Sequence, residues 1–216
     1  MIVKKTNWAG SGKVGLNYFR TVHGVNISCA MPVFAKDPTK SAAQMDQQER
    51  FSTLGKLASA FLTAIKIGLK NVAKQFGPLV SAFDAFVKVN GSAVSVMGGE
   101  AEIDYGSLKI SKGSLEQCGF HNASFETPQT IKVEYSTAIA GNGDAQDKIY
   151  LVAYQPDMNY ALMAPASLRT TGSITMDVPA SWTGLTVHVY GFVQGDGREN
   201  KGMLSESSYV GTGIIG

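Results

Sequence analysis

A glycine-rich segment near the N-terminus, residues 10–14 (GSGKV), carries residue types that could bind phosphate. Successive backbone N–H groups next to a lysine form an anion cradle in phosphate-binding loops. A Walker A loop, however, requires glycine where Asn7 stands and a hydroxyl residue where Val14 stands, and no predicted strand feeds the segment. We therefore expect no nucleotide binding, and we interpret the segment as part of a Gly-rich hairpin or assembly arm.

A second candidate is a metal site built from cysteine and histidine. Cys118 and His121 form a Cys-x-x-His pair, and His23 with Cys29 could complete a four-ligand zinc site. The spacing matches none of the usual structural-zinc patterns, and a cysteine among apolar neighbours is usually an inert buried thiol. A disulfide between Cys29 and Cys118 is disfavoured if the protein folds in a reducing cytosol. We expect both cysteines to be reduced and metal-free.

Acidic residues gather in two Gly-rich loops that could hold calcium through oxygen ligands. One loop carries Asp144 and Asp147, and the other carries Asp196 and Glu199. Neither loop shows the Asp-x-Asp-x-Asp-Gly series of a calcium loop, whereas Gly-Asp-Gly is ordinary hairpin-turn chemistry. We expect turns at both places.

Hydrolytic chemistry has little support, because no Gly-x-Ser-x-Gly elbow surrounds any serine. His188 lies in the middle of an alternating run, so we expect it to face outward from a strand. Glu102, Asp104 and Tyr105 could mark a polar groove, although an aspartate before Gly106 needs only a tight turn. The chain is therefore not expected to be an enzyme.

Composition sets the class of molecule. The 216 residues are 44% hydrophobic, and the formal net charge is only +2, too small to indicate nucleic-acid binding through phosphate neutralisation. Lys66 and Lys70 interrupt the most apolar stretch, and Trp8 and Gly10 interrupt any signal-peptide run, so neither a membrane span nor secretion is expected. The first forty residues are an exception, since the single acid Asp37 faces the basic residues Lys4, Lys5, Lys13, Arg20, Lys36 and Lys40.

A long amphipathic helix is expected from Ser41 to about Lys74. Ser41 and Gln44 match a capping box, in which each side chain satisfies a free backbone N–H at the helix start. The residues 77–78 (GP) end the pattern and leave 79–86 as a short helix or connector. Helical spacing relates the apolar residues Phe51, Leu54, Leu57, Ala58, Phe61, Leu62, Ile65, Leu69 and Val72.

Beyond the helix the hydrophobic period changes to two, which indicates short strands separated by turns. Seven or eight such strands favour an immunoglobulin-like antiparallel β-sandwich, with Trp182 plugging one end. The expected strands contain the pairs Val94/Val96, Ile103/Tyr105, Leu108/Ile110, Ile131/Val133, Tyr150/Val152, Ile174/Met176 and Val187/Val189, and also Val210.

The expected fold is therefore α+β and mainly β: an immunoglobulin-like antiparallel β-sandwich with an N-terminal hairpin arm and one long amphipathic helix. Residues 1–40 are assigned to the Gly-rich hairpin arm, which turns near His23 and Gly24, residues 41–88 to the helical segment and residues 89–216 to the sandwich. A two-stranded hairpin is marginal in water, so the arm must pack on its own domain or on a neighbour.

A succession of short motifs runs in order through nearly the whole chain: GKVG at 12–15, PT at 38–39 before Gln44, QERF at 48–51, IDY at 103–105, ISKGSL at 110–115, VYGF at 189–192 and SSYVG at 207–211. In this succession the chain resembles a family of uncharacterised proteins of Bacteroidetes and their phages. The resemblance implies a helix-plus-sandwich protein of non-enzymatic character, and a structural component of a phage or prophage. Gly191 departs from the family, in which Trp or Phe usually partners the first aromatic residue of the final strand.

These observations predict a non-enzymatic assembly subunit, a virion component of the capsid, neck or tail of a tailed phage or prophage. Expected partners are other copies of the chain or other virion proteins, without cofactor, metal, membrane, nucleic acid or small-molecule substrate. After synthesis in the bacterial cytoplasm the protein would reside in the virion. The residues expected at the assembly interface are Lys13, Tyr18, Phe19, Arg20, Val22, Val25 and Ile27 in the arm, and Phe61 and Ile65 on the helix.

Two points stay open at this level. The helix face around Phe61 and Ile65 could pack on the sandwich or on a neighbouring subunit. The alternative function is an immunoglobulin-like binding module that recognises a glycan or peptide through loops 141–147, 155–169 and 195–203.

Overall fold

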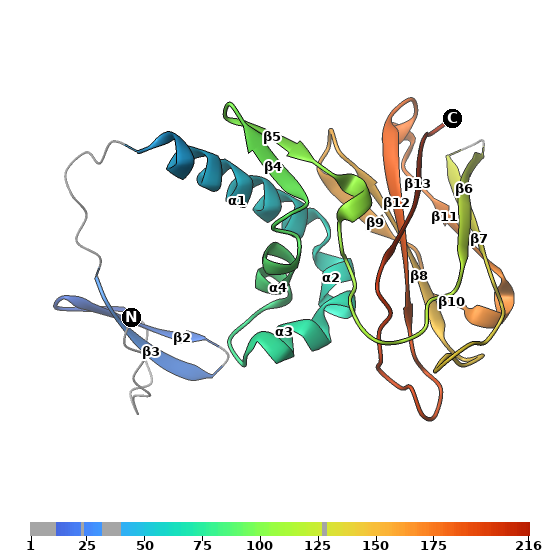
Figure 1. The fold of residues 1–216 in the computed structure, drawn as a ribbon, viewed down its shortest axis with the longest axis horizontal. Coiled ribbons are helices and arrows are strands. Elements are labelled where there is room, and N and C mark those ends of the chain that lie inside the picture. The colour runs from blue at the N-terminus through green and yellow to red at the C-terminus, as the bar shows by residue number, and fades with distance from the viewer. Residues whose placement is uncertain (1–11, 23, 32–39, 127–128) are drawn as a thin grey trace.

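The computed structural model describes residues 12–22, 24–31, 40–126 and 129–216. Beyond an N-terminal sheet, the described residues form three layers (Figure 1). Helices lie on one face of a central antiparallel sheet, and a smaller antiparallel sheet lies on its other face. The predicted fold class is confirmed, because the molecule is α+β and mainly β, with antiparallel sheets that are not closed into a barrel.

The two sheets that face each other supply most of the strands. The central sheet has the order β10-β8-β12-β13, and β9 also pairs with β8. Its strands are β8 (Lys148–Gln155), β9 (Tyr160–Met163), β10 (Ser167–Leu168), β12 (Thr186–Gln194) and β13 (Ser208–Ile214). The outer sheet has the order β11-β7-β6, with β6 (Phe120–Glu126), β7 (Thr130–Tyr135) and β11 (Ser173–Asp177).

Alternation along β12 creates a separate core on each face of the central sheet. Val187, Val189 and Val193 belong to the core shared with the outer sheet, whereas Tyr190 and Phe192 belong to the core shared with the helices. Successive side chains of a strand point to opposite faces, so a run that is apolar at every position is buried on both sides. The central sheet is thus the middle layer of the molecule.

The predicted helical segment is divided into α1 (Ala42–Ala60), α2 (Leu62–Gly68) and α3 (Lys70–Phe76), followed by α4 (Ala82–Val89). The expected capping box is confirmed, since the Ser41 N–H donates to Gln44 Oε1 over 2.9 Å and the Gln44 N–H donates to Ser41 Oγ over 3.3 Å. A second capping box, between Ser81 and Asp84, starts α4. The expectation of one long helix is wrong.

Two residues mark the breaks, Phe61 and Leu69, and both leave helical geometry with ψ close to zero. Each side chain is buried, so each break turns the chain while its own side chain enters the core. Gly68, just before the second break, lets residues 110–111 approach the helix closely, because a Cβ there would lie 2.3 Å from the carbonyl oxygen of Ile110. The segment therefore curls over the sheet instead of crossing it as a rod.

Other differences concern the strands. The pairs Val94/Val96 and Ile103/Tyr105 predict the region of β4 (Val94–Met97) and β5 (Glu100–Ile103), but this hairpin packs on α1 and not in the sandwich. The stretch 108–110 is not a strand: the Ile110 N–H donates to the Ser207 hydroxyl over 3.0 Å, outside any ladder. Strand β6 was not expected, and β9 lies where a loop was expected.

Two aromatic side chains, those of Trp182 and Phe120, explain details of the sandwich. Trp182 is buried in the core between the two sheets, in agreement with its predicted role as a plug. Gly191 faces the same core, and a Cβ there would lie 2.5 Å from the ring of Phe120. The aromatic ring that covers this point thus comes from β6, so glycine is the residue that fits.

The N-terminal residues form a separate three-stranded sheet, here called the arm sheet: β1 (Gly12–Val14), β2 (Asn17–Val22) and β3 (Val25–Ala30). The hairpin expected near Gly24 is confirmed by the Val22–Val25 pairing, while His23 lies outside the described residues. Among the described residues, no other element packs extensively on the arm sheet.

Within the described part of the chain, no helix is long and apolar enough to cross a bilayer.

Candidate functional site

The arm sheet sorts the predicted interface residues onto two faces. Its pairing places Tyr18 opposite Cys29, Arg20 opposite Ile27 and Val22 opposite Val25, and it places Lys13 beside Tyr18. Lys13, Tyr18, Arg20, Val22, Val25 and Ile27 therefore share one face, and Phe19 lies on the other. Ile27 is buried, whereas Lys13 and Arg20 are exposed.

The most exposed apolar side chains of the arm sheet lie at its β1–β2 turn. Val14 is 60% exposed and Leu16 is 83% exposed. Met31 joins them, because its N–H donates to the Leu16 carbonyl oxygen over 2.7 Å. We call these three residues the arm tip. Figure 1 shows the β1–β2 end of the sheet at the far left, pointing away from the helices.

None of the three arm-tip residues, Val14, Leu16 and Met31, was among the predicted interface residues. The signal for Leu16 was present in the sequence, since a large apolar residue stands between Gly15 and Asn17, where hairpin turns usually carry polar or glycine residues. Met31 could not be found in this way, because its position depends on the pairing of β3.

The two predicted helix residues lie in the chain's own core. Phe61 is 1% exposed, and its ring centroid lies 4.9 Å from that of Tyr154 and 5.6 Å from that of Tyr190. Ile65 belongs to the same cluster and is fully buried. Of the two packing partners left open for this face, the structure shows the sheet of the same chain, so Phe61 and Ile65 are not available to a neighbouring subunit.

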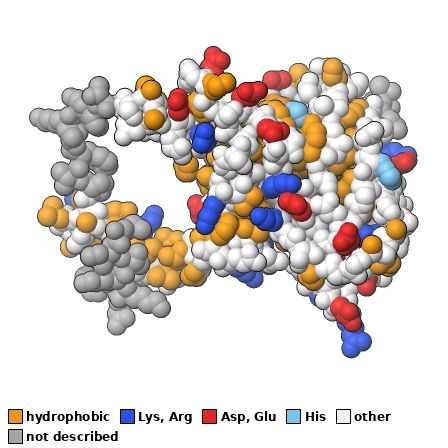
Figure 2. Space-filling model, viewed as in Figure 1, with side chains coloured by type: hydrophobic (Ala, Val, Ile, Leu, Met, Phe, Trp, Pro, Cys, Tyr) orange, Lys and Arg blue, Asp and Glu red, His pale blue; other side chains and the backbone are white. Residues whose placement is uncertain are grey.

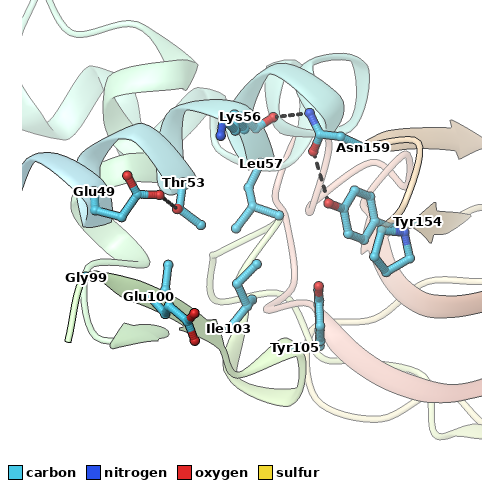
Figure 3. Close-up of a pocket in the computed structure, with 12 residues that line it drawn as sticks. Glu49, Thr53, Lys56, Leu57, Gly99, Glu100, Ile103, Tyr105, Tyr154 and Asn159 are labelled. Carbon is cyan, nitrogen blue, oxygen red and sulfur yellow. Dashed lines mark hydrogen bonds between the residues drawn. The ribbon is translucent and has the colours of Figure 1, made fainter. Parts of the chain in front are cut away.

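A groove of about 550 Å³ lies between α1 and the β4–β5 hairpin (Figure 3). Glu49 and Thr53 line it from α1, and the side of β5 that carries Ala101 and Ile103 lines it from the hairpin. Tyr105 stands near the end of the groove, in the short 3-10 turn Tyr105–Ser107. Of the predicted polar-groove residues, only Tyr105 lies in this lining; Glu102 and Asp104 do not.

Asp104 instead stabilises the tight turn that the sequence predicted. Its Oδ1 accepts the N–H groups of Gly106 and Ser107, at 3.1 and 3.2 Å, and its Oδ2 accepts the Ser107 hydroxyl. The hydrogen bond from the Ser107 hydroxyl lowers the pKa of the Asp104 carboxyl below its usual value.

The inner end of the α1–β5 groove is fixed by Asn159. Its Nδ2 donates to the Lys56 carbonyl oxygen over 3.2 Å, and its Oδ1 accepts the Tyr154 hydroxyl over 3.0 Å (Figure 3). Burial raises the pKa of Tyr154 well above its ordinary value. Tyr154 therefore stays protonated and acts as a donor, so this end of the groove is structural.

A second groove, of about 590 Å³, lies between α3 and the start of α4. Its floor is apolar and includes Ala73, Pro78, Val80 and Ala82. It is also lined by Lys66 from α2 and by Lys70 and Lys74 from α3, and the last two are four residues apart and therefore lie on one side of α3. We call it the lysine groove.

The two Gly-rich acidic loops lie together at one end of the central sheet. Asp147 is fully buried; its Oδ2 lies 3.2 Å from Arg169 Nη2, and its Oδ1 accepts Asn200 Nδ2 over 2.7 Å. Asp196 pairs with Lys148 over 2.8 Å at the surface. No group of three or more metal-binding side chains occurs within the described ranges. The carboxylates of Asp147 and Asp196 thus have protein partners.

The three loops proposed for glycan or peptide binding are not all at this end. Loop 141–147 precedes β8 and loop 195–203 follows β12, and the Lys148–Gln194 pairing joins these two strand ends. Residues 156–159 of the third loop follow the other end of β8, and eight residues of strand separate the two ends by about 26 Å. Residues Ser167 and Leu168 of the same loop return as β10 and pair with Ile149 and Lys148, so the last part of the third loop lies beside the first loop.

The remaining candidates are dispersed. Gly12 to Val14 form edge strand β1, and the earlier residues of the glycine-rich segment lie outside the described residues. Cys118 is buried, and this burial raises the pKa of its thiol to about 12, whereas His121 is exposed on β6. A thiol that is protonated at neutral pH is a poor nucleophile and a poor metal ligand.

His188 faces away from the sandwich interior, as expected, but it is half-buried between Tyr105 and Tyr209. Its ring stacks on Tyr105 with centroids 3.9 Å apart, and its Nδ1 lies 2.9 Å from the Tyr209 hydroxyl. Burial lowers the pKa of the imidazole.

A comparison with curated proteins finds no match to the chain. A family model spans residues 6–211, which is nearly the whole chain and includes the arm, the helices and both sheets. The chain therefore belongs to the family of unknown function DUF6266.

Proposed function

We propose that the protein is a non-enzymatic assembly subunit whose arm sheet packs on neighbouring copies of the chain. The observation that carries the proposal is the arm tip, where Val14 and Leu16 are more than half exposed at the end of the arm sheet farthest from the helices. A small sheet with one exposed apolar end is stabilised when a neighbour covers that end, because apolar surface is removed from water.

The charge of the arm supports a contact with another protein surface. Lys13 and Arg20 are exposed on the same face as Tyr18 and Val22, so the arm offers cations beside apolar side chains. Such a mixture suits a protein interface, where apolar contact supplies affinity and charge supplies orientation.

The setting we propose is the virion of a tailed phage or prophage of Bacteroidetes, with other virion proteins as further partners. This part of the proposal rests on the motif succession described above and on the arm, since lattice subunits commonly exchange extended segments. Peptides of this chain in purified virions, detected by mass spectrometry, would support the setting, and their absence from virions of a strain that expresses the chain would contradict it.

The assembly itself is tested by light scattering coupled to size-exclusion chromatography on the full chain. We expect the wild type to exceed the mass of a monomer and Leu16→Asp to reduce it, because a carboxylate at this position opposes burial. Ile139→Asp is the matched control, since Ile139 is also exposed but lies outside the arm. A wild type that stays monomeric at all concentrations, or a Leu16→Asp variant that assembles normally, would overturn the proposal.

A further inference from the structure

The β4–β5 hairpin has one face that is covered and one that is not. Its pairing places Val94, Val96, Ala101 and Ile103 on one side, and the hairpin packs on α1. Met97 pairs with Glu100 on the opposite side, where Met97 is 77% exposed and Glu100 is also exposed. Gly98 and Gly99, both with positive φ, form the turn that presents these side chains. The result is an apolar side chain flanked by acids, because Glu102 also lies on this side.

The lysine groove offers the complementary surface. Its apolar floor could receive an apolar side chain, and its rim carries Lys66, Lys70 and Lys74. Among the described residues, the observed ion pairs include neither these lysines nor Glu100 and Glu102. Asp84, the acid nearest in sequence to the groove lining, accepts the N–H and hydroxyl of Ser81 and thereby caps α4.

The spacing of the charges matches on the two surfaces. Glu100 and Glu102 are two residues apart on one strand, which separates them by about 6.6 Å. Lys70 and Lys74 are four residues apart on α3, which separates them by about 6 Å along the helix axis. Two carboxylates on the hairpin can therefore meet two lysines on the groove in the same register.

The two surfaces lie at opposite edges of the helical layer, with the hairpin turn at the top of Figure 1 and the α3–α4 connection at the bottom. Figure 2 shows acidic side chains over the upper edge of this layer, whereas several lysine and arginine side chains lie lower on it. A chain in this conformation cannot bring its own hairpin into its own groove, but a second copy can supply it.

We infer that the β4–β5 hairpin of one copy docks in the lysine groove of a second copy, with Met97 on the apolar floor and Glu100 and Glu102 paired with Lys70 and Lys74. The contact joins two different surfaces, so repetition gives a ring or a filament. The inference rests on the proposed assembly function and adds a second contact that is independent of the arm.

Charge reversal in the full chain tests the contact by sedimentation velocity. The hairpin variant is Glu100→Lys with Glu102→Lys, and the groove variant is Lys70→Glu with Lys74→Glu. Each variant alone places like charges opposite each other, so we expect self-association to weaken by at least about tenfold. Mixing the two variants restores opposite charges at every contact, so we expect assembly to return with one-to-one alternation. The paired swap Lys132→Glu with Glu134→Lys, which reverses an exposed ion pair elsewhere, is the matched control.

The outcomes separate this inference from the arm proposal. If both reversed variants associate as the wild type does while Leu16→Asp dissociates it, the hairpin contact is refuted and the arm proposal stands. If the reversed variants dissociate and their mixture reassembles while Leu16→Asp has no effect, the hairpin contact stands and the arm proposal fails. Reversed variants that dissociate but do not reassemble on mixing would also refute the pairing of these two surfaces, and a strictly monomeric wild type would refute both.

Discussion

At the scale of single residues, the ion pair between Asp147 and Arg169 is the most deeply buried of the ion pairs among the described residues. Both side chains are buried, and the guanidinium also donates to the carbonyl oxygens of Ala138 and Glu116, at 3.2 and 3.0 Å. These bonds tie the start of β8 to three neighbouring connections. Asp147 was considered as a calcium ligand in a turn; the structure shows a carboxylate that compensates a buried cation instead.

We predict that Asp147→Asn destabilises the fold by about 3–5 kcal/mol, because it leaves the buried charge of Arg169 without compensation. The matched control is Asp196→Asn, which breaks the ion pair with Lys148 at the surface, where the cost is about 1 kcal/mol or less. Urea denaturation of both variants checks the difference. Equal losses of unfolding free energy would show that the Asp147–Arg169 pair is no more important than a surface pair.

His188 should make stability depend on pH. Burial lowers its pKa below the ordinary value of 6.5, so the unfolded chain takes up a proton at a pH where the folded chain does not. Acidification below the ordinary pKa of 6.5 therefore favours unfolding, because the unfolded chain gains a proton there that the folded chain does not. We predict that His188→Gln flattens the dependence of unfolding free energy on pH in this window. The exposed His121→Gln serves as control, and an unchanged slope in His188→Gln would contradict the assignment.

At the scale of elements, the helical segment shows what an apolar pattern can and cannot predict. The capping box at Ser41 was read correctly because it depends on two residues in the same turn. The pattern also included Phe51, which is 57% exposed, because the buried residues of α1 begin only at Thr53. Periodicity gives the side of a helix that is apolar, but it does not give where the partner surface ends.

The strands show the same limit. Leu108 and Ile110 alternate like the residues of a strand and are buried. The backbone N–H groups of Lys109 and Ile110, however, donate to the side chains of Asn90 and Ser207 and not to a neighbouring strand. Strand β6, with the sequence FHNASFE, has few apolar residues to alternate, and it became a strand because β7 was available to pair with it. The ion pair between Asp147 and Arg169 could not be predicted for a related reason, since the two residues are far apart in the sequence and no local motif connects them. Contacts between elements decided each case.

The helix face provides a direct test of this distinction. We predict that Phe61→Ala lowers the unfolding free energy by about 3–5 kcal/mol, because the ring fills a site between Phe86, Tyr154 and Tyr190 that cannot collapse easily. Phe51→Ala removes the same atoms from an exposed position of α1 and should change stability by only about 0.5 kcal/mol. Denaturant titration compares the two, and a small effect of Phe61→Ala would mean that this face is not held by the sheet.

At the scale of the whole molecule, two cores lie back to back across the central sheet, and the arm belongs to neither. No residue of the arm sheet is a member of either core cluster. The helical core has members from α1 to β12 and includes Leu204, whereas the sandwich core runs from Leu115 to Ile215. Because both cores are complete without the arm, the arm can differ in its surroundings between a free chain and an assembly without any change in the rest of the fold.

This separation leads to the last prediction, which concerns deletion of residues 1–36. The deletion leaves the capping box of α1 and both cores in place, so the unfolding free energy of the remainder should change by no more than about 0.5 kcal/mol. Self-association should nevertheless fall, because the deletion removes Val14, Leu16 and Met31 together. Circular dichroism melting and light scattering on the same samples measure the two effects separately. A truncated chain that no longer unfolds cooperatively would show that the arm completes its own domain, and its exposed tip would then have to be explained by folding and not by assembly.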